Sequence, residues 1–182
     1  MIVKAPEERF PTAPEGTFAA VCVDEIDLGK VKTSFNGEER ERNMVRILWQ
    51  IDEEDKDGKP FMVRQDYTAS LDEKAKLRKH LQAWRGRAVT PAELVGFDME
   101  NVVGSGCMIS IVHAQGRKGG TFANVEGVMK LPKGVVAPTV RGYVRMKDRI
   151  AEEPTVQRDS RRAPEYQPPD FNQGITDDDV PF

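Results

Sequence analysis

The chain has 182 residues, of which 38% are hydrophobic and 31% charged, and its net charge is −3 at pH 7. This size allows one domain with a hydrophobic core plus a polar extension, and no run approaches the roughly 20 apolar residues of a membrane-spanning helix. Residues 1–9 lack the apolar core of a secretory signal, and Cys22 and Cys107 lie far apart in apolar runs. We therefore expect free thiols and a cytoplasmic location.

Three strands are expected in the first half of the chain, after a loose Pro- and Glu-rich N-terminal extension over residues 1–14. The first is rich in β-branched and apolar residues, and the next two alternate apolar and polar side chains with a period of two. The strands are predicted over residues 16–29, 44–51 and 61–68, with turn signals at Asn36-Gly37 and Asp57-Gly58.

A helix is predicted next. Ser70 with Glu73 three residues on has the spacing of a capping box, so the helix should begin directly after Ser70 and run to about Trp84. Gly86 should end it. A shorter helix is expected over residues 92–95.

Two further strands, over residues 107–113 and 121–131, are joined by a glycine-rich turn at 116–120. After Gly134 the chain becomes polar and rich in proline, and we expect it to be mostly disordered, with at most a short element within 139–150. The expected organisation is a flexible N-terminal extension (1–14), a domain (15–134) and a tail (135–182).

This order of elements predicts a mainly β fold: a five-stranded, partly open barrel like the oligonucleotide-binding (OB) fold, with its helix between the third and fourth strands. A small α+β sandwich would produce a similar pattern. No Cys-x-x-Cys pair, phosphate-binding loop or nucleophile setting is visible, so we expect neither a metal, a cofactor nor an enzymatic activity.

Basic residues gather between Asp72 and Arg87, which makes a nucleic-acid partner plausible in spite of the negative net charge. Binding of a single strand needs cations for phosphates and aromatic faces for bases. Trp49 shares its strand face with apolar residues and is expected in the core. Tyr67 and Trp84 could serve either as core or as base platforms, whereas Phe122 projects to the wetter strand face. The candidate nucleic-acid-binding residues are Arg46, Arg64, Tyr67, Lys79, Trp84, Arg85, Arg87, Arg117, Lys118 and Phe122.

The chain ends in an acidic run followed by an apolar tip, Asp177, Asp178, Asp179, Val180, Pro181 and Phe182. An exposed terminal Phe next to acids suits a partner pocket that is apolar inside and basic at its rim. This ending resembles the acidic tip of bacterial and phage single-stranded DNA-binding proteins, with Val180 where Ile is usual. The resemblance implies recruitment of host or phage replication and recombination proteins through these six residues.

The domain also resembles phage-type single-stranded DNA-binding proteins, through residues 67–71, the stretch 81–87 with Thr90, and residues 122–127 leading to 131–134. The resemblance implies an OB fold that coats single-stranded DNA in replication, recombination or repair. Two alternatives stay open: an adaptor with weak DNA affinity, and a strand-annealing recombinase. A homo-oligomer is also open.

Overall fold

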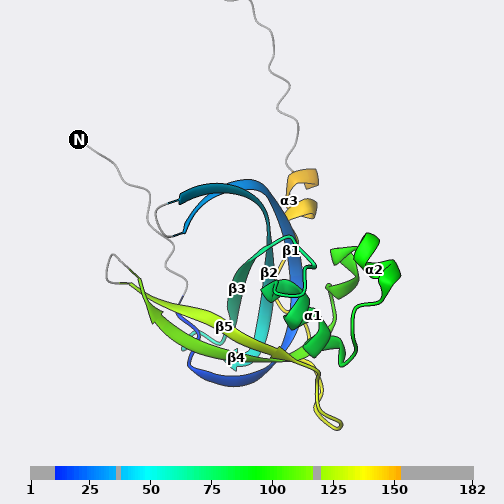
Figure 1. The fold of residues 1–182 in the computed structure, drawn as a ribbon. Helices are drawn as coiled ribbons and strands as arrows, with labels where there is room; N and C mark the ends of the chain where they lie inside the picture. Colours follow the sequence, from blue (N-terminus) through cyan, green and yellow to red (C-terminus); the bar gives the residue numbers. More distant parts are fainter. Residues whose placement is uncertain (1–10, 36–37, 117–119, 153–182) are drawn as a thin grey trace, which may run out of the picture.

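The computed structural model describes residues 11–35, 38–116 and 120–152. Five antiparallel strands form one sheet in the order β3-β2-β1-β4-β5 (Figure 1). The strands are β1 (Gly16–Phe35), β2 (Glu38–Glu54), β3 (Pro60–Thr68), β4 (Gly106–Gln115) and β5 (Thr121–Met129). The predicted mainly β, OB-like fold class is confirmed, including a helix between β3 and β4. Within the described residues the sheet is not closed by backbone pairing between its edge strands β3 and β5.

The core lies inside this curved sheet and follows the predicted alternation. Val45, Ile47, Trp49 and Ile51 are all buried, and the ring of Trp49 lies 6.0 Å from that of Trp84 between centroids. A period of two on a curved sheet sends one set of side chains inward and the other outward.

On β5 the inward set differs from the sequence pattern. Ala123 and Val125 face the core as expected, but a register shift in the β4–β5 pairing intervenes after Val125. A bulge adds one residue and thereby reverses which side chains point inward. Val128 is therefore buried, and Met129 is 45% exposed.

The helix α1 (Lys76–Arg85) begins later than predicted. Ser70 does not cap it: the Ser70 hydroxyl donates to Asp72 and accepts from the Asp72 amide, which forms a local turn ahead of the helix. The predicted end is confirmed, because Gly86 adopts a left-handed conformation with φ of 66° and its amide bonds to the Gln82 carbonyl.

Two short helical elements follow. In α2 (Pro91–Val95) a complete capping box joins Thr90 and Glu93, so the capping signal operates at this helix instead of at Ser70. The 3₁₀ turn η1 (Met99–Val102) was not predicted. Among the described residues, no helix has the length and apolar character needed to cross a bilayer.

Side chains of α1 link the two edge strands that the backbone leaves unpaired. The Tyr67 hydroxyl on β3 lies 2.9 Å from His80 Nδ1, and Lys76 Nζ donates to the β5 carbonyl of Val125 at 2.9 Å. His80 also has a hydrogen bond to the Glu126 backbone. The helix thus closes the barrel through side chains.

We expect His80 to make stability depend on pH. Burial, and secondarily the charge of Lys76, lower the pKa of His80 below its usual 6.5. The unfolded chain then binds the proton more tightly, so stability is complete above about pH 6.5 and falls as the pH drops through the window just below it. Urea midpoints at pH 7.5 and pH 5 measure the difference. His80→Gln, which retains an acceptor for Tyr67, should reduce the dependence; an unchanged dependence would show that other groups cause it.

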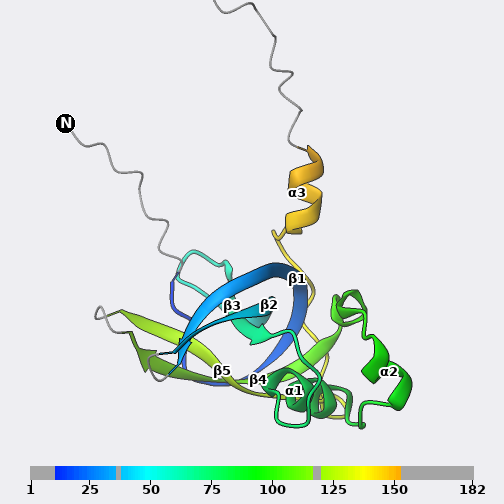
Figure 2. The ribbon, with the colours of Figure 1, turned by 45° about the horizontal axis from the view of Figure 1, so that its top comes forward.

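The ordered chain continues beyond the expected domain boundary at Gly134. Residues 135–145, here called the strap, run along β1 and lead into α3 (Met146–Glu152) (Figure 2). A Cβ on Gly106 would lie 2.5 Å from the Cβ of Ala137, so only glycine permits this approach. Further on, the buried Gln50 side chain exchanges two hydrogen bonds with the Arg141 backbone, at 2.7 and 2.8 Å.

Asp24 holds the end of the strap. Its carboxylate is almost fully buried and accepts from the Tyr143 hydroxyl, Arg145 Nε and the Met146 amide at 2.8, 3.0 and 2.8 Å. Burial works to raise the pKa of Asp24, but these hydrogen bonds outweigh it and the pKa lies below its usual value. The strap is therefore a bonded part of the domain.

Candidate nucleic-acid interface

The β1–β2 hairpin extends further than predicted. Residues 30–35 of β1 pair with 38–43 of β2 beyond the strand pairings of β3 and β4, and we call this two-stranded ribbon the arm. It carries Lys30, Lys32 and Arg42, all exposed. Figures 1 and 2 both show the arm end and the β4–β5 hairpin end on the same side of the molecule, here called the hairpin side, with α1 and α2 on the opposite side.

Phe122 is exposed on the hairpin side, as predicted from its strand register. Its side chain is 54% exposed, and its ring lies directly on the backbone of the β4–β5 turn. A Cβ on Gly116 would lie 2.3 Å from the ring, so glycine at that position leaves room for it. The edge of the ring is thus held against the glycines that flank the turn. A supported aromatic ring with open surface suits the stacking of an unpaired base.

Arg46 and Arg64 lie on the outer face of β2 and β3, where their registers placed them. Arg64 is exposed, whereas Arg46 forms a two-pronged ion pair with Asp66 at 2.6 and 2.8 Å. Hydrogen bonding to Arg46 holds the pKa of Asp66 below its usual value. Arg64 is consequently available for phosphate, whereas the charge of Arg46 is already paired with Asp66.

Two predicted aromatic platforms are corrected by the structure. Tyr67 is 2% exposed and its hydroxyl is bonded to His80. Trp84 is 5% exposed, and its indole N–H donates to the Gly106 carbonyl at 2.9 Å. Both rings pack α1 against the sheet, so neither can stack on a base in this conformation.

Arg85 and Arg87 are engaged within the protein. Both guanidiniums bind the Glu93 carboxylate of α2, and that of Arg85 also lies over the Phe97 ring, 5.2 Å from its centroid. Arg85 is mostly buried, so it joins α1 to α2 instead of presenting its charge to solvent. Arg87 is 54% exposed and could still meet a phosphate.

These arginines are also far from Phe122. The end of α1 contacts β5 at Lys130, whose amide donates to the Ala83 carbonyl. Phe122 precedes Lys130 by eight residues on β5 and its continuation. At the rise of an extended strand, the two residues are about 26 Å apart. The predicted candidates therefore do not form one compact site.

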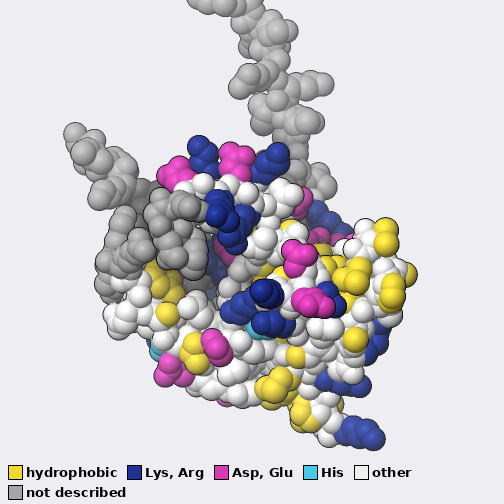
Figure 3. Space-filling model, in the orientation of Figure 1, with side chains coloured by type: hydrophobic (Ala, Val, Ile, Leu, Met, Phe, Trp, Pro, Cys, Tyr) yellow, Lys and Arg dark blue, Asp and Glu magenta, His cyan; other side chains and the backbone are white. Residues whose placement is uncertain are grey.

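The basic face of α1 is separate from the arm. Lys79 is exposed on α1. Figure 3 shows Lys and Arg side chains over the arm and over α1, with acidic side chains interspersed among them in both places. Arg117, Lys118 and the acidic tip at 177–182 lie outside the described residues.

The arm cations were not identified from the sequence. The predicted first strand ended at Gly29. However, basic residues occupy every second position on both sides of the Asn36-Gly37 turn: Lys30 and Lys32 before it, and Arg40 and Arg42 after it. That symmetry about a turn signal indicates a longer hairpin.

No family model matches the chain, and a search of the curated proteins found no match either.

Proposed function

We propose that the protein binds single-stranded DNA with little base specificity on its hairpin side. The observation that carries this proposal is the exposed Phe122 ring beside the β4–β5 turn, on the same side of the molecule as the arm, whose exposed Lys30, Lys32 and Arg42 alternate with Glu39 and Glu41. OB folds bind oligonucleotides through the outer face of strands two and three and the loops that flank it. Here those elements supply Arg64, the arm and Phe122.

In this proposal a base stacks on Phe122 while Lys30, Lys32, Arg42 and Arg64 neutralise phosphates along the strand. No side chain among these distinguishes one base from another. The protein would coat and protect single strands in the cytoplasm during replication, recombination or repair, and no reaction or cofactor is assigned to it.

The test is a titration with a fluorescent reporter. Trp49 and Trp84 are both buried, so their emission should change little when single-stranded DNA binds. A Phe122→Trp variant keeps a stacking ring and should be strongly quenched by single strands. Duplex DNA should quench it much less at the same salt concentration, and binding should weaken steeply with salt. Equal quenching by duplex DNA would contradict the stacking proposal.

We further propose that the acidic tip at 177–182 recruits replication or recombination proteins. The alternative function, an adaptor with weak DNA affinity, would use the tip in the same way. Phe182→Ala keeps every charge but removes the ring that a partner pocket would receive. It should therefore abolish capture of such proteins while leaving DNA affinity unchanged. Asp177→Asn is a matched control that should weaken capture only partly. Capture by Phe182→Ala equal to that by the parent would reduce the tip to a solubilising tail.

The strand-annealing alternative predicts large assemblies. Light scattering of the protein with and without single-stranded DNA separates rings or filaments from a small complex that only coats the strand.

A further inference from the structure

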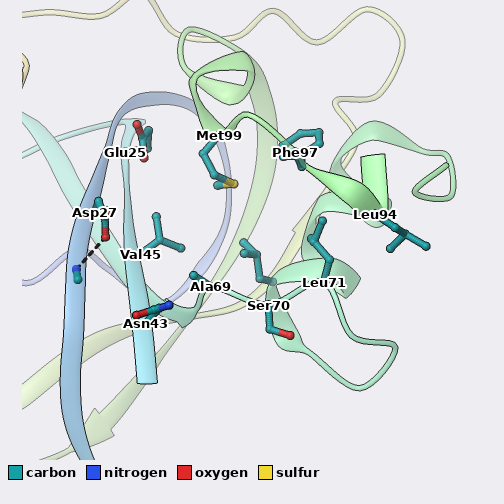
Figure 4. A pocket seen from close by; sticks show the side chains of 12 residues that line it. Glu25, Asp27, Asn43, Val45, Ala69, Ser70, Leu71, Leu94, Phe97 and Met99 are labelled. Atoms are coloured by element: carbon teal, nitrogen blue, oxygen red, sulfur yellow. Dashed lines mark hydrogen bonds between the residues drawn. The ribbon is translucent and has the colours of Figure 1, made fainter. Parts of the chain in front are cut away.

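A groove lies on the side of the molecule away from Phe122, between the base of the arm and the helical region. It has a volume of about 570 Å³. Figure 4 shows Glu25 and Asp27 along the β1 wall, opposite Leu71, Leu94 and Phe97. The lining also includes Val45, Leu77 and Met99. The groove therefore combines an apolar floor with an acidic wall.

No cation forms an ion pair with the acidic wall among the described residues, although Arg145 lies near enough for its charge to act on Glu25. Among the described residues the Glu25 side chain has neither a hydrogen bond nor an ion pair, and Asp27 accepts only from the Gly29 amide at 2.7 Å. Burial, together with the nearby Glu100, raises the pKa of Glu25. A carboxylate in such a place is stabilised by an incoming positive charge.

The chain itself leaves the domain beside this groove. Arg145 binds both Asp24 and Glu100, and Lys147 binds Glu100 at 2.8 Å. Asp24 and Glu100 are the chain neighbours of the groove residues Glu25 and Met99. The start of α3 is thus fixed at the rim of the groove, and the helix projects outward from there (Figure 2).

The sequence that follows is complementary to the groove. Residues 155–166 contain Arg158, Arg161 and Arg162 against Asp159 and Glu165, together with Val156 and Tyr166. Residues 167–182 carry four aspartates and no base. Like charges exclude the acidic part from a wall formed by Glu25 and Asp27. Only the first part of the tail offers both arginines and apolar side chains.

We propose that residues 156–166 dock in this groove of the same chain, with their arginines against Glu25 and Asp27 and an apolar side chain on the floor. The path is long enough. The seven residues of α3 span about 10 Å, and the six residues from Glu152 to Arg158 reach up to about 20 Å when extended.

Docking leaves only residues 167–182 free, which confines the tip to roughly 22 Å root-mean-square from its anchor. This inference is independent of DNA binding.

The test uses the full chain with a photo-crosslinking benzoylphenylalanine at position 94. Leu94 lines the groove, whereas its neighbour Val95 is 92% exposed and does not, so a probe at position 95 is the matched control. After illumination and proteolysis, mass spectrometry should join position 94 to peptides from 153–166. A mixture of isotopically light and heavy protein should show that both peptides come from one chain.

Charge variants decide whether the acidic wall is responsible. Replacing Arg158, Arg161 and Arg162 by Glu changes no side chain of the described domain and should reduce these crosslinks about tenfold. Adding Glu25→Lys with Asp27→Lys should restore them. Equal crosslinking from positions 94 and 95, attachment to residues 167–182, or no effect of the triple variant would overturn the proposal. Crosslinks between light and heavy chains would also overturn it, since they would assign the groove to a second copy.

Discussion

Asp24→Ala should lower the free energy of unfolding by about 3–5 kcal/mol, the usual cost of removing one partner from a buried ion pair. Asp24 is 1% exposed, and its carboxylate receives the strap through Tyr143, Arg145 and Met146. Because Arg145 keeps its bonds to Glu100, we expect a value near the lower end of that range. Urea unfolding followed by tryptophan emission measures it, since Trp49 and Trp84 report on the core.

Two variants act as controls for this result. Glu100→Gln weakens a pair whose carboxylate is exposed to solvent, so it should destabilise the fold much less than Asp24→Ala does. Asp24→Asn retains an acceptor oxygen and should fall between the two. Trypsin should also cut the strap of Asp24→Ala faster than that of the parent. If Asp24→Ala matched Glu100→Gln in stability and in trypsin resistance, the strap would not depend on this carboxylate.

Phe122→Ala should weaken binding of single-stranded DNA by about 1–3 kcal/mol, which is roughly 5- to 150-fold in Kd, because it removes one base stack. The ring is 54% exposed and rests on a turn, so the melting temperature should change little. Fluorescence anisotropy with a labelled single strand gives the affinity, and thermal unfolding gives the stability.

Matched variants separate stacking from general apolar contact. Phe122→Leu keeps most of the apolar volume but loses the aromatic face, so it should bind nearly as weakly as Phe122→Ala. Val112→Ala lies on the same hairpin, is 38% exposed and has no ring, and its affinity should equal that of the parent. A large drop in melting temperature with unchanged affinity per folded molecule would place Phe122 among structural residues and contradict its proposed role.

Several elements could be predicted from the sequence because their causes are local. The alternation through Val45 and Ile51 defines a strand with one buried face, and Gly86 can take the left-handed conformation that ends α1. The register of Phe122 on β5 was sufficient to expect its exposure. Each of these signals depends only on residues within a few positions along the chain.

The same capping-box spacing occurs at two places in the sequence, but it begins a helix at only one of them. Ser70 and Thr90 both precede a glutamate by three residues, yet only Thr90 caps a helix. Packing of Leu77 and Leu81 against the sheet positions α1, and its start follows from that packing. Tertiary contacts commonly override a capping preference worth about 1 kcal/mol.

By itself, the sequence determined the five strands and the helix between the third and fourth of them. Only the tertiary structure decided that Tyr67 and Trp84 are buried, that Arg85 is committed to Glu93, and that the strap belongs to the domain. The physical reason is distance along the chain. Asp24 meets Arg145 and Gln50 meets Arg141 across roughly a hundred residues, and no local pattern encodes which partner closes such a gap.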